Sequence, residues 1–427
     1  MWPADRSPMQ APRPHYEHVQ ALLRARPRTW LVTGVAGFIG THLLHTLLEL
    51  NQRVIGLDNF STGHHSNLDE VRSLLSPTQW ARFDFIEGDI RDLPDCLRAC
   101  QGVDHVLHQA ALGSPQHSRD DPIACNDVNV SGFLNMLVAA RDCRVKSFTY
   151  ASSNAVYGEH TDLPLPEQHT GRPLSVFGAS KLSNEQYAQI FAHQHDLACT
   201  GLRYFDVFGP RQDPNGPDAG LIPQWIASLL RGEPVSIPGD GETRRDFCYV
   251  ANVVQANLLA AMAVEAPAPR ATALAAADSA WRAGHSTACR HAKSLIYNAG
   301  MGEQVRLNTL FVLLRTHLSA DGVSLSAQPA HQDHRASGWG HSQPDMRQAR
   351  QHLGYAPTHS LVQGLMETLR ALPGSGSPTT GTNSIQQDAA FGGPAGVPAS
   401  ALAREAPTAP VDHLAPRIGQ LLTRQTP

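Results

Sequence analysis

The stretch Trp30-Leu31-Val32-Thr33-Gly34-Val35-Ala36-Gly37-Phe38-Ile39-Gly40 decides the fold of this 427-residue chain. Its first residues form a short apolar run, which is typical of a buried parallel strand. The glycines that follow have the spacing G-x-x-G-x-x-G and stand directly before an amphipathic segment, Thr41 to Leu50. Glycine allows a tight turn and a close approach of the backbone to a pyrophosphate, and the N-terminus of the next helix offers N–H groups to the same anion. We therefore predict a strand–turn–helix unit that binds a dinucleotide.

The alternation of apolar runs and helical stretches continues through the first half of the chain. Further strands are predicted at Arg53 to Leu57, Phe83 to Glu87, His105 to His108 and Lys146 to Ala151. Strand–helix repetition at this spacing predicts an α/β fold with a doubly wound parallel sheet, the Rossmann fold. After about residue 200 the pattern becomes irregular, which suits a smaller lobe.

The predicted organisation has three parts. We expect an NAD-binding Rossmann domain over residues 16–200, with core elements recurring later, and a smaller α/β substrate-binding lobe over residues 201–372. An inserted loop rich in Ala, Pro, Arg and His interrupts the lobe at residues 264–293. Residues 374–427 are rich in Gly, Ser, Thr and Pro, which predicts a disordered tail.

Composition excludes several classes of protein. The net charge is −4 and the basic residues are scattered, so we expect no nucleic-acid partner. The first 30 residues lack an apolar core, and no apolar run approaches 18 residues, so we expect no signal peptide and no membrane. Seven cysteines, mostly within apolar segments, indicate reduced thiols in a cytoplasmic protein. His285, Cys289 and His291 lie in the low-complexity insert, where compositional drift explains them better than a metal site.

The preferred dinucleotide follows from Asp58, which stands 24 residues after Gly34 at the end of the second predicted strand. A carboxylate there accepts hydrogen bonds from the adenosine ribose and repels a 2′-phosphate, which favours NAD over NADP. We expect Asp89 and Ile90 to lie against the adenine and Ala110 and Ala111 to line the pyrophosphate. The predicted cofactor site is therefore Gly34, Gly37, Phe38, Ile39, Gly40, Asp58, Asn59, Asp89, Ile90, Ala110, Ala111 and Lys181.

Six stretches, the opening one among them, carry a resemblance to a known family. They are Leu57 to Gly63, His108 to Ser114, Gly201 to Phe205, Arg211 to Gly216, Gly239 to Phe247 and the opening Trp30 to Gly40. On these stretches the chain resembles the extended short-chain dehydrogenase/reductase superfamily and its NAD-dependent epimerase/dehydratase family. It is most similar to the bacterial UDP-N-acetylglucosamine 4-epimerases of surface-polysaccharide biosynthesis. The resemblance runs from about residue 16 to about residue 357, interrupted by the insert.

The resemblance implies a reaction on a UDP-sugar. Bound NAD takes hydride from C4 while a tyrosinate takes the 4-hydroxyl proton, and the 4-keto sugar turns over before hydride returns. By the family pattern Ser153 hydrogen-bonds the 4-oxygen, and Lys181 holds the nicotinamide ribose and lowers the tyrosine pKa. The chain has only three lysines, which argues against chance at position 181.

The same resemblance assigns substrate and partner contacts. Arg245 and Arg335 would clamp the UDP pyrophosphate, since a guanidinium fork suits paired phosphate oxygens. The positions beside the sugar C2 are small apart from Gln212, which favours UDP-GlcNAc and UDP-GalNAc; they are Gly113, Ser114, Gln212, Gly220 and Ser342. Family members commonly dimerise through two helices of the Rossmann domain, which implies a homodimer to which Leu182, Tyr187 and Ile190 could contribute.

Four departures from the family pattern fall on the catalytic and substrate side. Phe177 stands where the family has its catalytic tyrosine, and loss of a positioned acid/base costs roughly 10²–10⁴ in rate. Asp206 stands where the family usually has Asn; a carboxylate only accepts hydrogen bonds, and its charge opposes a diphosphate. Arg335-Ala336-Ser337-Gly338 replaces the usual Arg-Glu-Gly-Asp, and the 264–293 insert precedes the strand near Ile296.

Three interpretations therefore stay open. One is a slow or rescued UDP-N-acetylhexosamine 4-epimerase, and the second is a catalytically inactive NAD-binding pseudoenzyme. The third is another UDP-sugar-modifying enzyme: a 4,6-dehydratase is disfavoured because it needs an Asp-Glu pair where this chain has Asn154-Ala155, and a UDP-glucuronate decarboxylase remains an alternative with no residue in its favour. Tyr157 and His117 are the candidates for a substitute base, and neither is favoured.

Overall fold

The computed structural model describes residues 15–160, 162–216, 219–265, 294–320, 328–332 and 340–372. Arg335 with its altered loop, almost all of the predicted insert and the predicted tail lie outside these described residues. All of the described residues belong to one compact unit that ends before Pro378.

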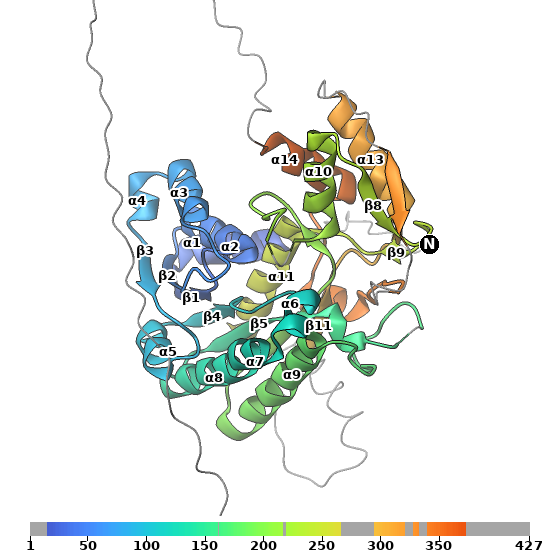
Figure 1. Ribbon diagram of the computed structural model, residues 1–427. Coiled ribbons are helices and arrows are strands. Elements are labelled where there is room, and N and C mark those ends of the chain that lie inside the picture. Colours follow the sequence, from blue (N-terminus) through green and yellow to red (C-terminus); the bar gives the residue numbers. More distant parts are fainter. Residues whose placement is uncertain are drawn as a thin grey trace, which may run out of the picture. The chain divides into compact units, whose positions relative to one another are not determined.

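A seven-stranded parallel sheet forms the centre of this unit (Figure 1). Its spatial order is β11-β6-β5-β4-β1-β2-β3. The strands are β1 (Thr29–Thr33), β2 (Arg53–Asp58), β3 (Phe83–Glu87), β4 (His105–His108), β5 (Ser147–Ser153), β6 (Cys199–Tyr204) and β11 (Ser294–Ala299). Successive strands are added outward from β1 toward β3 and then, on the other side, from β4 toward β6. The sheet is therefore doubly wound, and the predicted fold class is confirmed.

Helices cover both faces of the sheet (Figure 1). One face carries α1 (His15–Ala25), α2 (Phe38–Glu49), α3 (His65–Leu74), α4 (Pro77–Trp80) and α11 (Val250–Met262), which continues into the 3₁₀ turn η3 (Ala263–Glu265). The other carries α5 (Leu93–Cys100), α7 (Pro122–Asn126), the π-helical turn η1 (Asp127–Gly132), α8 (Phe133–Asp142) and α9 (Val176–His195). The short helix α6 (Pro115–Asp120) follows β4.

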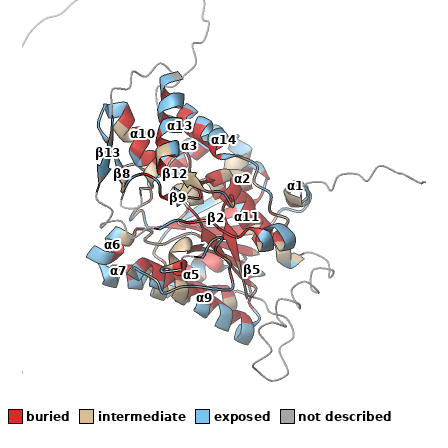
Figure 2. Cartoon of the chain, turned by 90° about the vertical axis from the view of Figure 1, so that its right-hand side faces the viewer, coloured by how far each residue is buried: buried red, intermediate tan, exposed pale blue. Residues whose placement is uncertain are grey.

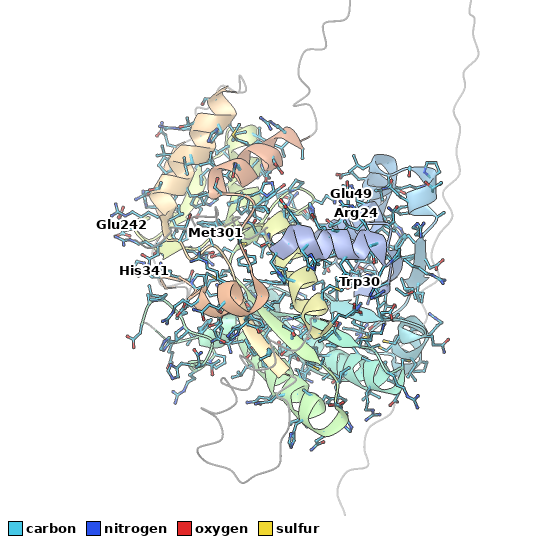
Figure 3. All side chains as sticks on the ribbon, turned by 180° about the vertical axis from the view of Figure 1, so that it is seen from behind. Arg24, Trp30, Glu49, Glu242, Met301 and His341 are labelled. Atoms are coloured by element: carbon cyan, nitrogen blue, oxygen red, sulfur yellow. The ribbon has the colours of Figure 1, made fainter. Side chains whose placement is uncertain are left out.

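The burial of β1 explains why its sequence is apolar throughout. Trp30 and Val32 pack into the core beneath α2 and α11, whereas Leu31 packs into the core beneath α5, α8 and α9. The indole Nε1 of Trp30, labelled in Figure 3, donates to Gln52 Oε1 over 3.2 Å, so its one polar atom is satisfied. Figure 2 shows the same pattern at the centre of the sheet: the central strands are buried, while the outer side of α9 is exposed. The edge strand β3 differs, because its residues are partly or fully exposed.

One continuous helical segment, Pro122–Asp142, is long and apolar enough to cross a membrane by length and composition alone. Its residues Phe133, Met136 and Leu137 are fully buried in the core that α5 and α9 share with the sheet. A core helix of a doubly wound sheet meets the same criterion, so this segment is weak evidence for a membrane.

The second part of the structure is a lobe with its own apolar core, which includes Trp225, Leu229, Leu310 and Leu365. Its elements are β7 (Val207–Phe208), α10 (Leu221–Arg231), β8 (Val235–Pro238), β9 (Arg244–Arg245), β10 (Cys248–Tyr249), β12 (Val305–Arg306), α13 (Leu307–Ala320), β13 (Pro329–Gln332) and α14 (Leu361–Arg370). They form three two-stranded pairs, β7 with β10, β9 with β12 and β8 with β13. Two turns complete the described elements: η2 (Asn154–Tyr157) after β5, and η6 (Ala349–Leu353).

The chain after residue 200 contributes to both parts. Strand β11 returns from the lobe to pair with β6, and α11 packs on the sheet against α2. The lobe is therefore joined to the sheet at several points, which fixes it over the carboxyl ends of the strands.

Candidate active site

A cavity of about 660 Å³ lies where the carboxyl ends of the strands meet the lobe. Open α/β sheets bind ligands at this edge, where the direction of winding reverses. Its lining includes all but one of the described residues predicted for the site: Gly34, Gly37, Phe38, Ile39, Gly40, Asp58, Asn59, Asp89, Ile90, Ala110, Ala111, Gly113, Ser114, Ser153, Phe177, Lys181, Asp206, Gln212, Gly220 and Arg245. The exception is Ser342.

The glycine turn leaves no room for side chains. Gly34 has φ +66°, and a Cβ on it would lie 2.8 Å from the backbone nitrogen of Ala110. A Cβ on Gly40 would overlap the carbonyl oxygen of Gly34. Helix α2 begins directly after Gly37, and no side chain caps its N-terminus. The uncapped N–H groups and the bare backbone together form a cradle that fits a pyrophosphate.

Asp58 connects the end of β2 to this turn. Its Oδ2 accepts from the Ala36 N–H and its Oδ1 from the Phe60 N–H, each over 2.8 Å. Burial raises the pKa of Asp58, and these backbone hydrogen bonds oppose the rise. Each carboxylate oxygen keeps a further lone pair toward the cavity, so Asp58 can still accept from a ribose hydroxyl. Residues 34–58 therefore fit NAD.

The expected adenine side is organised by Asp89. Its Oδ2 accepts from Asn59 Nδ2 over 2.8 Å, and Arg91 pairs with the same carboxylate. The hydrogen bonds from Arg91 lower the pKa of Asp89 to about 2, despite partial burial. Ile90 is buried beside it and presents an apolar surface to the cavity.

Phe177 and Lys181 lie one helical turn apart in the first turns of α9. Ser175 caps this helix, because its Oγ accepts from the Gly178 N–H over 3.0 Å. Both Phe177 and Lys181 are buried, with 7% and 4% of their surface exposed. Lys181 Nζ donates to the Ala151 carbonyl over 3.0 Å and lies 5.8 Å from the centroid of the Phe177 ring. The ammonium is thus positioned to act on whatever group stands at position 177.

Ser153 ends β5 on the same wall of the cavity. Its Oγ accepts from the Ala155 N–H over 3.1 Å and lies 3.4 Å from Asn154 Oδ1. The turn that follows the strand therefore orients the hydroxyl, and the hydrogen bond that the hydroxyl itself donates, to Asn154 Oδ1, is long and weak. It remains able to donate to a ligand oxygen.

Among the described residues that line this cavity, no tyrosine is free to supply the hydroxyl that Phe177 lacks. Tyr204 is the one tyrosine there, and its hydroxyl donates to Gln109 Oε1 and accepts from Asn257. Tyr157 lines a neighbouring cavity; its hydroxyl donates to Asn298 Oδ1 over 2.7 Å, and burial raises its pKa to about 12. His117 is in the last turn of α6 and lines neither cavity.

The small positions come from two parts of the cavity lining, the segment after β4 and the lobe. Ser114 is the N-cap of α6 and accepts from the His117 N–H over 3.1 Å. Gln212 donates through Nε2 to the Val207 carbonyl, while its Oε1 is buried and has no hydrogen-bond partner. A Cβ on Gly220 would lie 3.1 Å from that Nε2, so the glycine makes room for Gln212.

Ser342 lies in a second cavity of about 360 Å³, not in the first. The two cavities share Pro115, Arg119 and Asn154 in their linings, so they adjoin. The Oγ of Ser342 is buried without a hydrogen-bond partner. His341, labelled in Figure 3, lines the same cavity and accepts from the Arg244 N–H. The predicted cluster around the sugar C2 is thus divided between two adjoining spaces.

Sequence reasoning missed several lining residues and one contact. Arg119 and Gln224 line the main cavity outside the stretches that carry the resemblance, and Thr243 lies within Gly239 to Phe247 but was not assigned to the site. The missed contact joins two predicted residues, because Arg245 Nη2 donates to Asp206 Oδ1 over 2.5 Å. The two positions are 39 residues apart in the chain, and neither motif indicates the other.

Comparison with known proteins identifies relatives of this arrangement. The sequence profile of the NAD dependent epimerase/dehydratase family matches residues 30–275. A UDP-glucose 4-epimerase of Mycolicibacterium smegmatis is 31% identical over 342 residues, which cover 79% of this chain and 96% of that protein.

Solved structures give the same result. The UDP-glucose 4-epimerase of Thermotoga maritima with UDP-glucose is 32% identical, with a TM-score of 0.66 over 80% of this chain and 98% of that one. The UDP-N-acetylglucosamine 4-epimerase of Methanobrevibacter ruminantium, in complex with UDP-N-acetylmuramic acid, is 29% identical, with a TM-score of 0.68 over 81% and 98%. A dTDP-glucose 4,6-dehydratase with NAD bound also shares the fold.

Proposed function

Because this chain belongs to the NAD-dependent epimerase/dehydratase family, with NAD as its cofactor, we propose that it is a UDP-sugar 4-epimerase of the UDP-GlcNAc/UDP-GalNAc type. In this proposal its proton transfer is impaired. The observation that carries the second part is Phe177, whose ring faces the cavity beside Lys181 where a proton-transferring phenol would stand.

The contacts suggest a separate role for each group in the proposed site. Bound NAD supplies a reversible hydride acceptor at its nicotinamide. The Ser153 hydroxyl would donate a hydrogen bond to the 4-oxygen and so orient it, without giving up its proton. Lys181 supplies a positive charge that favours deprotonation of a neighbouring acid, yet Phe177 has no proton to lose. Orientation and cofactor binding are therefore retained, whereas the acid/base step lacks its group.

The proposed sugar preference rests on space. Gly113, Ser114 and Gly220 are small, and the unpartnered Oε1 of Gln212 can accept from the N–H of an acetamido group. Arg119 stands between the two cavities, so a larger C2 or C3 substituent would extend toward Ser342. A UDP-hexose without such a substituent would leave these polar groups to water.

The phenylalanine at position 177 also favours one alternative, an NAD-binding pseudoenzyme. The impaired epimerase and the pseudoenzyme would both bind NAD through the same residues and would differ only in turnover. The decisive experiment assays the unaltered protein and Phe177→Tyr side by side for interconversion of UDP-GlcNAc and UDP-GalNAc. We expect the tyrosine variant to be faster by about 10²–10⁴.

Each result of this assay has a distinct meaning. If only the tyrosine variant turns over, the unaltered protein is the pseudoenzyme. If the two proteins turn over at equal rates, another group moves the proton and our assignment of position 177 is wrong. If neither turns over while both retain NAD, the proposed substrate is wrong.

We further propose a cytoplasmic homodimer that serves polysaccharide biosynthesis. The exposed Ile190, on the outer side of α9, supports a contact between subunits. Light scattering of the purified protein tests this, and a monomer at micromolar concentration would contradict it. Ile190→Glu should shift the dimer toward monomer without loss of bound NAD.

A further inference from the structure

The proposed substrate site contains an internal ion pair where a diphosphate would need a cation. Arg245 Nη2 contacts Asp206 Oδ1 over 2.5 Å, and both side chains are largely buried, with 11% and 19% exposed. Both residues line the main cavity. A guanidinium that is paired with a carboxylate through even one of its nitrogens presents less net charge to a third group.

The backbone holds the two partners together. Asp206 lies between β6 and β7, and its carbonyl oxygen accepts from the Cys248 N–H over 3.1 Å. Arg245 is in β9, where it pairs with Val305 of β12. Strand β7, which follows Asp206, pairs with β10, and Cys248 of β10 is only three residues beyond Arg245. These backbone contacts hold the two residues near each other.

The remaining charges do not compensate. Among the described residues that line the main cavity, the cations are Arg119, Lys181 and Arg245. Lys181 lies deep beside Phe177, and Arg119 is exposed on α6. The second oxygen of Asp206, Oδ2, is buried without a hydrogen-bond partner. A diphosphate that reached Arg245 would therefore meet an adjacent unsatisfied carboxylate oxygen.

We propose that Asp206 is a specificity-determining residue that competes internally for Arg245 and so weakens the binding of diphosphate-linked ligands. This inference rests on the proposed function, because it takes a UDP-sugar as the ligand. Asn at position 206 would keep the shape and still accept from Arg245, but it would remove the competing charge. The guanidinium then becomes available to phosphate oxygens.

The test is calorimetric titration of the full-length, NAD-loaded protein with UDP, UMP and uridine. The variants are Asp206→Asn, Arg245→Gln and the double variant, with Glu70→Gln as a matched control that breaks the Arg211–Glu70 ion pair outside the cavity. We expect Asp206→Asn to bind UDP about 10- to 100-fold more tightly, which is the effect of one regained charge-assisted hydrogen bond. The gain should be smaller for UMP and absent for uridine.

The double variant decides whether the gain acts through Arg245, since the gain should vanish when that guanidinium is removed. Equal UDP affinity of the unaltered protein and Asp206→Asn would overturn the inference and leave the proposed function intact. A gain that persists without Arg245, or that extends to uridine, would overturn it too. If no variant binds UDP although all retain NAD and unfold cooperatively, the proposed substrate class falls and the inference with it.

Discussion

At the scale of single residues, the proton-transfer step depends on the distance between Lys181 and position 177. The ammonium lies 5.8 Å from the ring centroid of Phe177. In Phe177→Tyr this charge favours the phenolate, so we expect activity to rise with pH and to level off below the ordinary tyrosine pKa of about 10. Adding Lys181→Met should move the same rise to higher pH and lower the plateau. Initial rates from pH 6 to 10 on the two variants measure this, and an unchanged profile would contradict a role for Lys181.

Much of the site at this scale was predictable, because its residues belong to local motifs. The glycine turn, Asp58 and Lys181 each sit at a fixed distance from a strand or from a helical turn, and the structure places all of them at one cavity. The Asp206–Arg245 pair was not predictable, since a contact between residues 39 apart depends on how β6 and β9 are brought together. Their roles in catalysis and binding stay predictions until the variants are measured.

At the scale of elements, α9 carries the proposed catalytic positions, Phe177 and Lys181, and its first turn is capped by Ser175. Ser175 Oγ accepts from Gly178, and Ser360 Oγ caps α14 in the same way by accepting from Gln363. We expect Ser175→Ala and Ser360→Ala each to lower the free energy of unfolding by about 1 kcal/mol. Only Ser175→Ala should also lower the activity of Phe177→Tyr, because it loosens the turn that holds position 177. Equal activity of the two alanine variants would show that the cap does not position the ring.

The elements themselves show what sequence patterns resolve. The strand at His105–His108 is where it was predicted, because its buried residues form a short apolar run that ends in the polar residues of a turn. The edge strand Phe83–Glu87 is also at its predicted place, although it is largely exposed. A strand near Ile296 and core elements after residue 200 were expected. The pairing of β11 with β6 was not predictable, because β6 lies about 95 residues earlier along the chain. The domain boundary predicted at residue 200 therefore stays a prediction, because residues on both sides of it contribute strands to one sheet.

At the scale of the whole molecule, buried histidines govern stability in mild acid. Burial lowers the pKa of His42 and His108 to about 3 and that of His105 to about 4. Between pH 6.5 and 4 the unfolded chain therefore binds more protons at these sites than the folded chain, so the free energy of unfolding falls as pH falls. Burial raises the pKa of Asp246 to about 7, and it also raises the pKa of Asp58, Glu167 and Asp206, which acts in the opposite direction.

Calorimetry from pH 7.5 to 5 should thus show a falling unfolding temperature, with up to about 1.4 kcal/mol lost per pH unit for each fully coupled proton. His105→Gln should reduce the slope of the free energy of unfolding against pH by the equivalent of about one proton, because a neutral amide replaces the ring. His18→Gln, at an exposed position on α1, is the matched control and should leave it unchanged. A protein equally stable at pH 5 and pH 7.5 would contradict this account.

The late position of β11 in the chain has a consequence for synthesis. A growing polypeptide has already produced the glycine turn, Asp58 and Lys181 when β6 emerges, yet the neighbour of β6 follows only after residue 293. During that interval β6 presents a row of unpaired backbone groups at the open side of the sheet, which is the surface through which partly made chains aggregate. A chain ending at residue 265 should bind NAD yet precipitate, and early capture of the nucleotide would be its main protection during translation.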